Sequence, residues 1–369
     1  MALNNIRDYL FNKLFFPKVV VIDKPGIIYS ETSKKYGKTK SKKRQVWFFE
    51  DVIAHLQLET AKKFGNKRAS EIWYEIGKNI GARLLLFGGP KKVSSFFLPS
   101  IINYVFNSLR SGGLSLAETI EFNPANKSLI LTGKDNIISR KSNNPHFFAG
   151  IVSGILSILL RENIEAEAKY ENFLKEYKII ADPLIKTKYV VNQKELIRIK
   201  NYENLNFPKM ESPQSKFYSF NDLVRFKKIL VNKGKFSFLN KIIIPSESGL
   251  LSLIIKYFDE MGEIEMIKNG LINSTEKLSA DLLKDRIFKN NKVDSIKKIF
   301  CALGWGIPYH KIDGENIIFT FLYPPISRYG FLYLSLILNG HLNYIFNKKL
   351  KIKKIIIEKK MPKVSITYS

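Results

Sequence analysis

Cysteine and histidine are scarce in this chain, which has one cysteine and four histidines among 369 residues. The single cysteine, Cys301, excludes an internal disulfide framework and every metal site built from several cysteines. No HxH, HExxH or CxxC spacing occurs, so the sequence gives no basis for a metal site. We therefore expect no metal, no cofactor and no catalytic residue.

Apolar runs long enough to cross a membrane are also missing. His146–Leu160 has 15 residues, short of the roughly 20 that a spanning helix needs. Ile326–Phe346 is longer, but it contains Asn339, His341 and Asn343, which are costly in lipid. The N-terminal residues carry charges and no small-residue cleavage site, so no signal peptide is expected. These absences predict a cytoplasmic protein without a transmembrane span.

Acidic residues are few beside basic ones: 33 Asp and Glu against 60 Lys and Arg, a net charge of +27. Hydrophobic residues make up 45% of the chain, which excludes global disorder. The positive excess favours an anionic partner, either nucleic acid or a membrane surface. A genome-wide bias toward Lys, Ile and Asn is the alternative explanation of the charge.

Two segments concentrate the basic residues. The first, residues 33–44, has no apolar period and is expected to be an exposed basic arm, with a merely solvated loop as the alternative. The second is a strand predicted at 350–357, where Lys351 and Lys353 share a face that could follow phosphates. Lysines on an edge strand also prevent aggregation, so both roles stay open for this strand. The residues expected to bind nucleic acid are Lys34, Lys35, Lys38, Lys40, Lys42, Lys43, Arg44, Lys351 and Lys353.

An internal repeat is the most informative pattern in the sequence. Residues of the first half recur in the second half at two constant offsets. The matches are Phe106, Leu109 and Gly112 with Phe300, Leu303 and Gly306 at 194 positions, and Pro145 and Gly150 with Pro325 and Gly330 at 180 positions. The first copy therefore has 14 extra residues, most of them in the polar stretch 135–144.

Hydrophobic periodicity predicts the same element order in both copies: helices, a hairpin, a helix and two closing strands. In the first copy the predicted helices are 50–64, 70–87, 93–109 and 145–160, and the strands are 114–122, 128–131, 165–170 and 175–180. In the second copy the predicted helices are 249–261, 263–284, 295–303 and 325–346, and the strands are 307–309, 317–321, 350–357 and 364–368. The expected fold is α+β, with two tandem helix–hairpin–helix–two-strand units packed as a pseudo-dimer.

This pattern divides the chain into four parts. Residues 1–45 are expected to form an N-terminal helix, a strand and the basic arm, and residues 46–181 the first α+β unit. Residues 182–244 are expected to be a connector, and residues 245–369 a second, divergent α+β unit.

Two segments of the first unit resemble a known family. Tyr74–Gly81 and Pro145–Leu156, the latter followed by two strands, resemble the vinyl-reductase-type (4-vinyl reductase) small-ligand-binding domain superfamily, which is related to TRAPP-type tethering subunits. The resemblance covers about residues 46–181. It extends to 245–369, where Pro325 and Gly330 are kept and Leu334 replaces the second small residue.

The resemblance implies a mixed α/β fold, dimer-like pairing and an apolar pocket near the glycine-bearing helix. Such domains often bind small hydrocarbons or lipids. The cysteines that many members carry near the closing strands are absent here, which argues against a metal-assisted or thiol role. The residues expected to line the pocket are Phe147, Gly150, Ile151 and Gly154. Close approach of two helices is the alternative explanation for the two glycines.

These observations favour a non-enzymatic binding protein that associates with nucleic acid or a ribonucleoprotein through its basic surfaces. A sensor or regulator of a small apolar ligand, such as a hydrocarbon or lipid, is the alternative. We also expect the edges of the sheets to bind other proteins.

Overall fold

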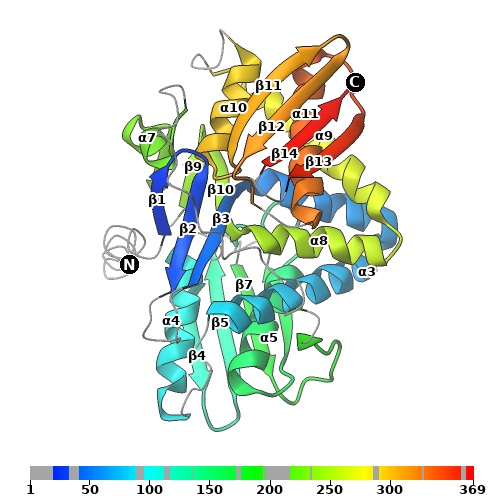
Figure 1. The fold of residues 1–369 in the computed structure, drawn as a ribbon. Helices are drawn as coiled ribbons and strands as arrows, with labels where there is room; N and C mark the ends of the chain where they lie inside the picture. Colours follow the sequence, from blue (N-terminus) through cyan, green and yellow to red (C-terminus); the bar gives the residue numbers. More distant parts are fainter. Residues whose placement is uncertain are drawn as a thin grey trace.

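The computed structural model describes residues 20–32, 41–88, 95–111, 117–134, 136–171, 176–193, 196, 217–232, 235–285, 291–325, 328–358 and 363–369. In these ranges the chain has a mixed α/β fold whose strands form three antiparallel sheets (Figure 1). The helices are α3 (Glu50–Gly88), α4 (Leu98–Ser111), α5 (His146–Leu160), α7 (Phe220–Arg225), α8 (Ser248–Glu260), α9 (Ile264–Leu282), α10 (Lys292–Ala302) and α11 (Arg328–Phe346), with a short 3-10 helix η3 (Ser95–Phe97).

The largest sheet has six strands in the order β1-β2-β3-β10-β9-β8. Its strands are β1 (Val20–Lys24), β2 (Ile27–Thr32), β3 (Ser41–Phe49), β8 (Ile229–Asn232), β9 (Lys235–Phe238) and β10 (Lys241–Glu247). At its centre β3 and β10 run antiparallel, with Phe49 opposite Ile243 and Gln45 opposite Glu247. The stretch 182–244, expected to be a connector, therefore supplies most of one half of a sheet.

The other two sheets have four strands each, in the orders β4-β5-β7-β6 and β11-β12-β14-β13. Their strands are β4 (Ala117–Asn123), β5 (Ser128–Lys134), β6 (Glu165–Glu171), β7 (Glu176–Asp182), β11 (Ile307–Asp313), β12 (Asn316–Leu322), β13 (Ile352–Glu358) and β14 (Lys363–Tyr368). In both, one hairpin precedes a long apolar helix and the other follows it. Helix α5 packs on β6 and β7, whereas α10 and α11 contact the sheet that contains β11 to β14.

Helix α3 contains two helical segments that meet at a kink, close to the break that the sequence pattern predicts. The helices expected at 50–64 and 70–87 form one element that turns at Gly65, where φ is 77° and ψ is 158°. No atom lies within 4 Å of the position that a Cβ on Gly65 would occupy, so backbone conformation alone favours glycine there. In the second half, Gly262, with φ of 76°, lies between α8 and α9.

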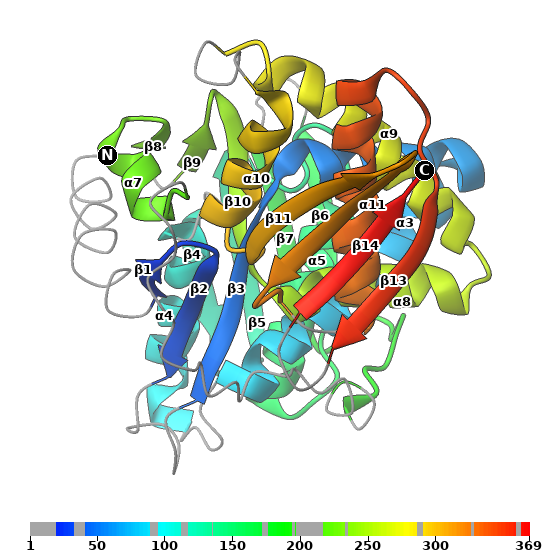
Figure 2. The same cartoon turned by 45° about the horizontal axis from the view of Figure 1, so that its top comes forward.

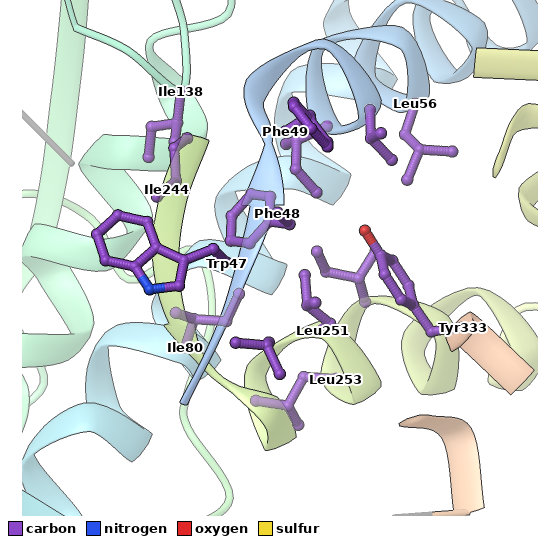
Figure 3. Close-up of a cluster of buried hydrophobic side chains, with 14 of the residues drawn as sticks. Trp47, Phe48, Phe49, Leu56, Ile80, Ile138, Ile244, Leu251, Leu253 and Tyr333 are labelled. Carbon is purple, nitrogen blue, oxygen red and sulfur yellow. The ribbon is translucent and has the colours of Figure 1, made fainter. Parts of the chain in front are cut away.

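The hydrophobic core is continuous across these elements and is centred on β3. Trp47, Phe48 and Phe49 are all buried. Figure 3 shows them in one cluster with side chains from α3, β10, α8 and α11, among them Ile244 and Tyr333. The central sheet thus packs against both halves of the chain.

The two helices whose sequences came nearest to a membrane span are largely buried in the protein. In α5, every residue from Phe147 to Ser157 is buried. In α11, Leu334, Leu338 and Leu342 are fully buried. Across the part of the chain that the structure describes, no helix combines the length and apolar character that crossing a membrane requires.

Candidate functional site

Helices α3 and α5 cross with their backbones in direct contact at four glycines. A Cβ built on Gly150 would lie 2.1 Å from the carbonyl oxygen of Tyr74. For Gly77, Gly81 and Gly154 the corresponding distances to backbone oxygens of the opposite helix are 2.0 to 2.1 Å. No side chain larger than hydrogen fits at these positions unless the helices move apart.

The four residues expected to line a ligand pocket all lie at this crossing and are all buried: Phe147, Gly150, Ile151 and Gly154. None of them lines any of the three hollows described below. The contact between α3 and α5 accounts for the small residues without a ligand.

A small, largely apolar cavity lies elsewhere, between β3 and the helices α9, α10 and α11. Its volume is about 20 Å³, room for one water molecule. The rings around it include Trp47, Phe300, Trp305 and Tyr333, and His341 contributes an imidazole. Trp305 stacks on Tyr333, with ring centroids 5.4 Å apart and an angle of 11° between the planes.

The polar groups of this cavity carry no charge. His341 Nδ1 lies 2.5 Å from the hydroxyl of Ser279, which also donates a hydrogen bond to the carbonyl of Thr275 at 2.7 Å. Because a hydroxyl has one proton, this arrangement places the ring proton of His341 on Nδ1 and leaves Nε2 as an acceptor. Burial lowers the pKa of His341 to about 3 and raises the pKa of Tyr333, so both side chains are neutral at pH 7.

A buried ion pair in the first half has no counterpart in the sequence-based predictions. Lys78 Nζ lies 2.7 Å from Glu165 Oε1, and both side chains are almost fully buried. The Tyr74 hydroxyl and the backbone N–H groups of Lys188 and Tyr189 also donate to this carboxylate. The pair therefore joins α3, β6 and the segment after β7. Lys78 lies one helical turn after Tyr74, on the face of α3 that meets α5. A lysine on a helix face that is otherwise apolar was the feature of the sequence that could have indicated a buried ion pair.

The pKa values in this network follow from burial and hydrogen bonding. Burial by itself would raise the pKa of Glu165, but hydrogen bonds from Lys78, Tyr74 and the Tyr189 backbone outweigh it and lower the pKa. Burial lowers the pKa of Lys78, and the bond to Glu165 opposes that effect. Burial and the bond to Glu165 both raise the pKa of Tyr74.

Two open grooves lie on the surface near this network. One, of about 710 Å³, is bordered by Arg68, Glu71, His146 and other polar residues, and Arg68 and Glu71 pair at 3.0 Å. The other, of about 650 Å³, runs between the ends of α3 and α5 and the segment that contains Val190. Both grooves are lined in part by charged side chains, whereas the cavity beside Tyr333 is not.

The predicted basic arm is only partly within the described residues. Four of its cations lie outside them: Lys34, Lys35, Lys38 and Lys40. Lys42 and Lys43 belong to β3, where their backbones lie opposite Glu31 and Ser30 of β2 in the strand register. The expectation of a loop that continues to residue 44 is therefore wrong for residues 41–44, because strand pairing with β2 orders them.

Arg44 is the clearest correction. Only 4% of it is exposed, and its guanidinium donates to the carbonyls of Gly26, Gly304 and Tyr323. Burial lowers the pKa of Arg44 to about 9, which leaves it charged at pH 7. This cation ties the β1–β2 turn to the loop after α10 and is inaccessible to a phosphate.

Lys351, just before the edge strand β13, and Lys353, within it, are both exposed. A register shift between Ile352 and Lys354 interrupts the expected alternation, so Lys353 and Lys354 are both exposed. The exposed lysines expected at this strand are therefore present, and Lys354 is exposed in addition to the two that simple alternation predicts.

Cys301 is buried and unpaired, and burial raises its pKa, so it is not a thiolate at pH 7. Within the described ranges no group of three or more His, Cys, Asp or Glu residues is arranged to hold a metal ion.

Comparisons with known proteins give little further information. No family model matches the chain, and no curated protein matches it. Among solved structures, the chain is similar to the phenol-responsive sensory domain of the transcription activator PoxR, determined with phenol. The match has 15% identity and a TM-score of 0.31, and it covers 49% of this chain and 92% of that domain. A TM-score this low assigns neither fold nor function.

Proposed function

We propose that the chain is a tandem duplication of one α+β unit, packed as a pseudo-dimer that binds a small uncharged molecule. The six-stranded sheet supports the duplication. Its order places the meander β1-β2-β3 beside the meander β10-β9-β8, and the two central strands are antiparallel. Two copies related by a two-fold axis would pair in this way. Each meander leads directly into a helix, α3 or α8.

Contacts around the last helix of each unit repeat in detail. In the first, the Ser153 hydroxyl donates to the carbonyl of Ile164 at 2.6 Å, and the Ile164 N–H donates to Ser157 at 3.0 Å. In the second, the same bonds join Asn339 to Leu350 at 3.2 Å and Leu350 to Asn343 at 2.8 Å. All three residues recur 186 positions later, and this offset replaces the 180 suggested by the prolines and by Gly150 and Gly330.

The offset of 186 relates the predicted pocket to the observed cavity. It matches Phe147 with Tyr333 and Ile151 with Ile337, and both later residues line the cavity. It matches Gly150 with Leu336, but it matches Gly154 with Gly340, where a Cβ would lie 2.4 Å from the carbonyl oxygen of Ile272 in α9. The second unit therefore keeps one of the two close helix contacts, and Leu336 opposes an equally close contact only on its own turn of α11.

The chemistry of the cavity carries the proposed function. Aromatic walls with a few oriented polar groups are typical of small-molecule sites. The neutral imidazole of His341 lines the cavity and favours an uncharged guest that can form a hydrogen bond with it, such as a small alcohol. Because the cavity has room for one water molecule, a larger guest enters only when rings such as Trp305 and Tyr333 move.

Thermal denaturation with two matched probes, toluene and benzyl alcohol, tests this function. A guest that binds only the folded protein raises the melting temperature in proportion to the logarithm of its concentration. We expect benzyl alcohol to give the larger shift, because it alone can donate a hydrogen bond to His341. In the variant His341→Leu, the shift caused by benzyl alcohol should no longer exceed the shift caused by toluene, and the shift caused by toluene should remain.

A second variant tests the location. Ile337→Phe takes up the space of the cavity and should abolish both shifts, whereas Ile312→Phe, on a side chain that is 63% exposed, should leave them unchanged. If the wild-type protein shows no shift with either probe, or if both shifts survive in a folded Ile337→Phe variant, the cavity is not the site.

A further inference from the structure

The sheet that contains β11 to β14 leaves one of its faces uncovered by any described helix. Phe319 and Phe321 of β12 and Val364 and Ile366 of β14 are buried on the side of α10 and α11. Figure 2 shows the opposite face turned outward, with α11 behind the strands. The side chains that alternate with the buried ones therefore face solvent.

Two rows of side chains cross this outer face from β11 to β13. Strand pairing gives the rows Tyr309, Thr320, Ser365, Ile356 and Lys311, Ile318, Thr367, Lys354. Tyr309 is 39% exposed, and its ring contacts Phe217 edge to face at 5.8 Å. The face thus combines an accessible aromatic ring, small hydroxyl side chains and a lysine at either side.

Cations dominate the β13 border of this face. Five lysines are exposed there: Lys348, Lys349, Lys351, Lys353 and Lys354. The carboxylate of this strand, Glu358, pairs with Lys363 at 2.9 Å. On the β11–β12 hairpin, Asp313 pairs with Lys311 at 3.7 Å, and Glu315 is also exposed. The lysine border remains positive after these acids are counted.

We propose that this outer face binds single-stranded nucleic acid. Tyr309 provides a surface on which an unpaired base stacks, and the β13 lysines neutralise successive phosphates. A broad open sheet suits a single strand, whose bases are free to lie flat on it. An anionic membrane would instead favour a continuous apolar surface, which Thr320, Ser365 and Thr367 interrupt.

The corresponding face of the other four-stranded sheet differs in charge and provides an internal control. Its outward side chains include Glu121 and Glu167 beside Lys169 and Lys178. Carboxylates interspersed among the lysines repel phosphates, so we expect no binding there. The pairs Lys353–Lys354 and Lys169–Lys178 each carry two exposed lysines and give matched variants.

The experiment measures fluorescence anisotropy of a labelled poly-thymidine oligonucleotide with the full chain at several salt concentrations. Each phosphate contact to a single strand contributes about 0.7 to the slope of log affinity against log salt. The double variant Lys353→Gln/Lys354→Gln should therefore lower the slope by about 1.4, and Lys169→Gln/Lys178→Gln should leave it unchanged. Arginine at positions 353 and 354 should restore the slope, which separates lost charge from altered folding.

A third variant tests base stacking. Tyr309→Ala should weaken binding by about 5- to 150-fold at an unchanged salt slope, because stacking releases no counterions. Tyr104→Ala, on the exposed face of α4, should have no effect. Equal slopes for the wild type and the 353/354 variant, or full affinity in Tyr309→Ala, would overturn the proposal. Stronger binding to phosphatidylserine vesicles than to the oligonucleotide would overturn it as well.

Discussion

At the scale of single residues, the buried pair of Lys78 and Glu165 is the feature with the largest expected effect. Replacing Glu165 by Gln leaves the Lys78 ammonium buried without a carboxylate, which costs about 3–5 kcal/mol in the free energy of unfolding. Urea denaturation measures this loss. Glu167→Gln is the matched control, because Glu167 lies two residues further along β6, is 60% exposed and forms an ion pair with Lys188 at 3.8 Å. An exposed pair of this kind contributes at most about 1 kcal/mol, and equal losses in the two variants would contradict the buried-pair explanation.

The same carboxylate predicts how stability changes with pH. Since the folded protein lowers the pKa of Glu165 below its ordinary value of 4.5, the unfolded chain takes up the proton first as pH falls. The stabilisation is therefore complete above about pH 4.5 and is lost as pH falls further, toward the folded pKa. Urea midpoints of the wild type and Glu165→Gln, measured from pH 7 to pH 3, should converge in acid. If the difference between the two urea midpoints stays constant from pH 7 to pH 3, Glu165 does not titrate as proposed.

At the scale of secondary-structure elements, the contact between α3 and α5 decides where glycine is required. Gly150→Ala should destabilise the protein by about 1–3 kcal/mol through overpacking, because its Cβ meets a backbone oxygen that cannot rotate away. Gly150→Leu should cost more. Gly270→Ala is the control: its Cβ would meet only the flexible end of Leu56, at 2.8 Å, and alanine gains helix propensity. Thermal or urea denaturation that ranks Gly270→Ala as the more harmful variant would refute this explanation.

Elements also show what local pattern predicts well. The helix expected at 145–160 corresponds to α5, and the strand expected at 364–368 lies within β14, because periodicity and nearby turn residues are local signals. The break expected after residue 64 is present as a kink: Gly65 has non-helical dihedral angles, and helical segments lie on either side of it within α3. Strands β8, β9 and β10 were not predicted. β8 pairs with β9 and β9 with β10 as local hairpins that the connector prediction missed, whereas the pairing of β10 with β3 joins segments far apart in the sequence.

At the scale of the whole molecule, the proposed duplication predicts equal costs at equivalent positions. Ser157 and Asn343 each accept the N–H of a residue within two positions of the start of a closing strand, Ile164 or Leu350. Ser157→Ala and Asn343→Ala should therefore each leave one buried N–H unpaired and lose about 1–3 kcal/mol. Chemical denaturation compares them directly. A large loss in one variant and none in the other would argue against equivalent roles for the two helices.

The sequence by itself determined the mixed α/β composition, most helices and hairpins, and the excess of lysine at the last strands, because these depend on residues close together in the chain. Tertiary structure decided the rest. Arg44 ends a basic run in the sequence, yet pairing with β2 buries it among backbone carbonyls. Gly150 and Gly154 resemble a pocket motif, yet α3 fills the space beside them. The small cavity forms where β3 meets α9, α10 and α11, which only long-range packing brings together.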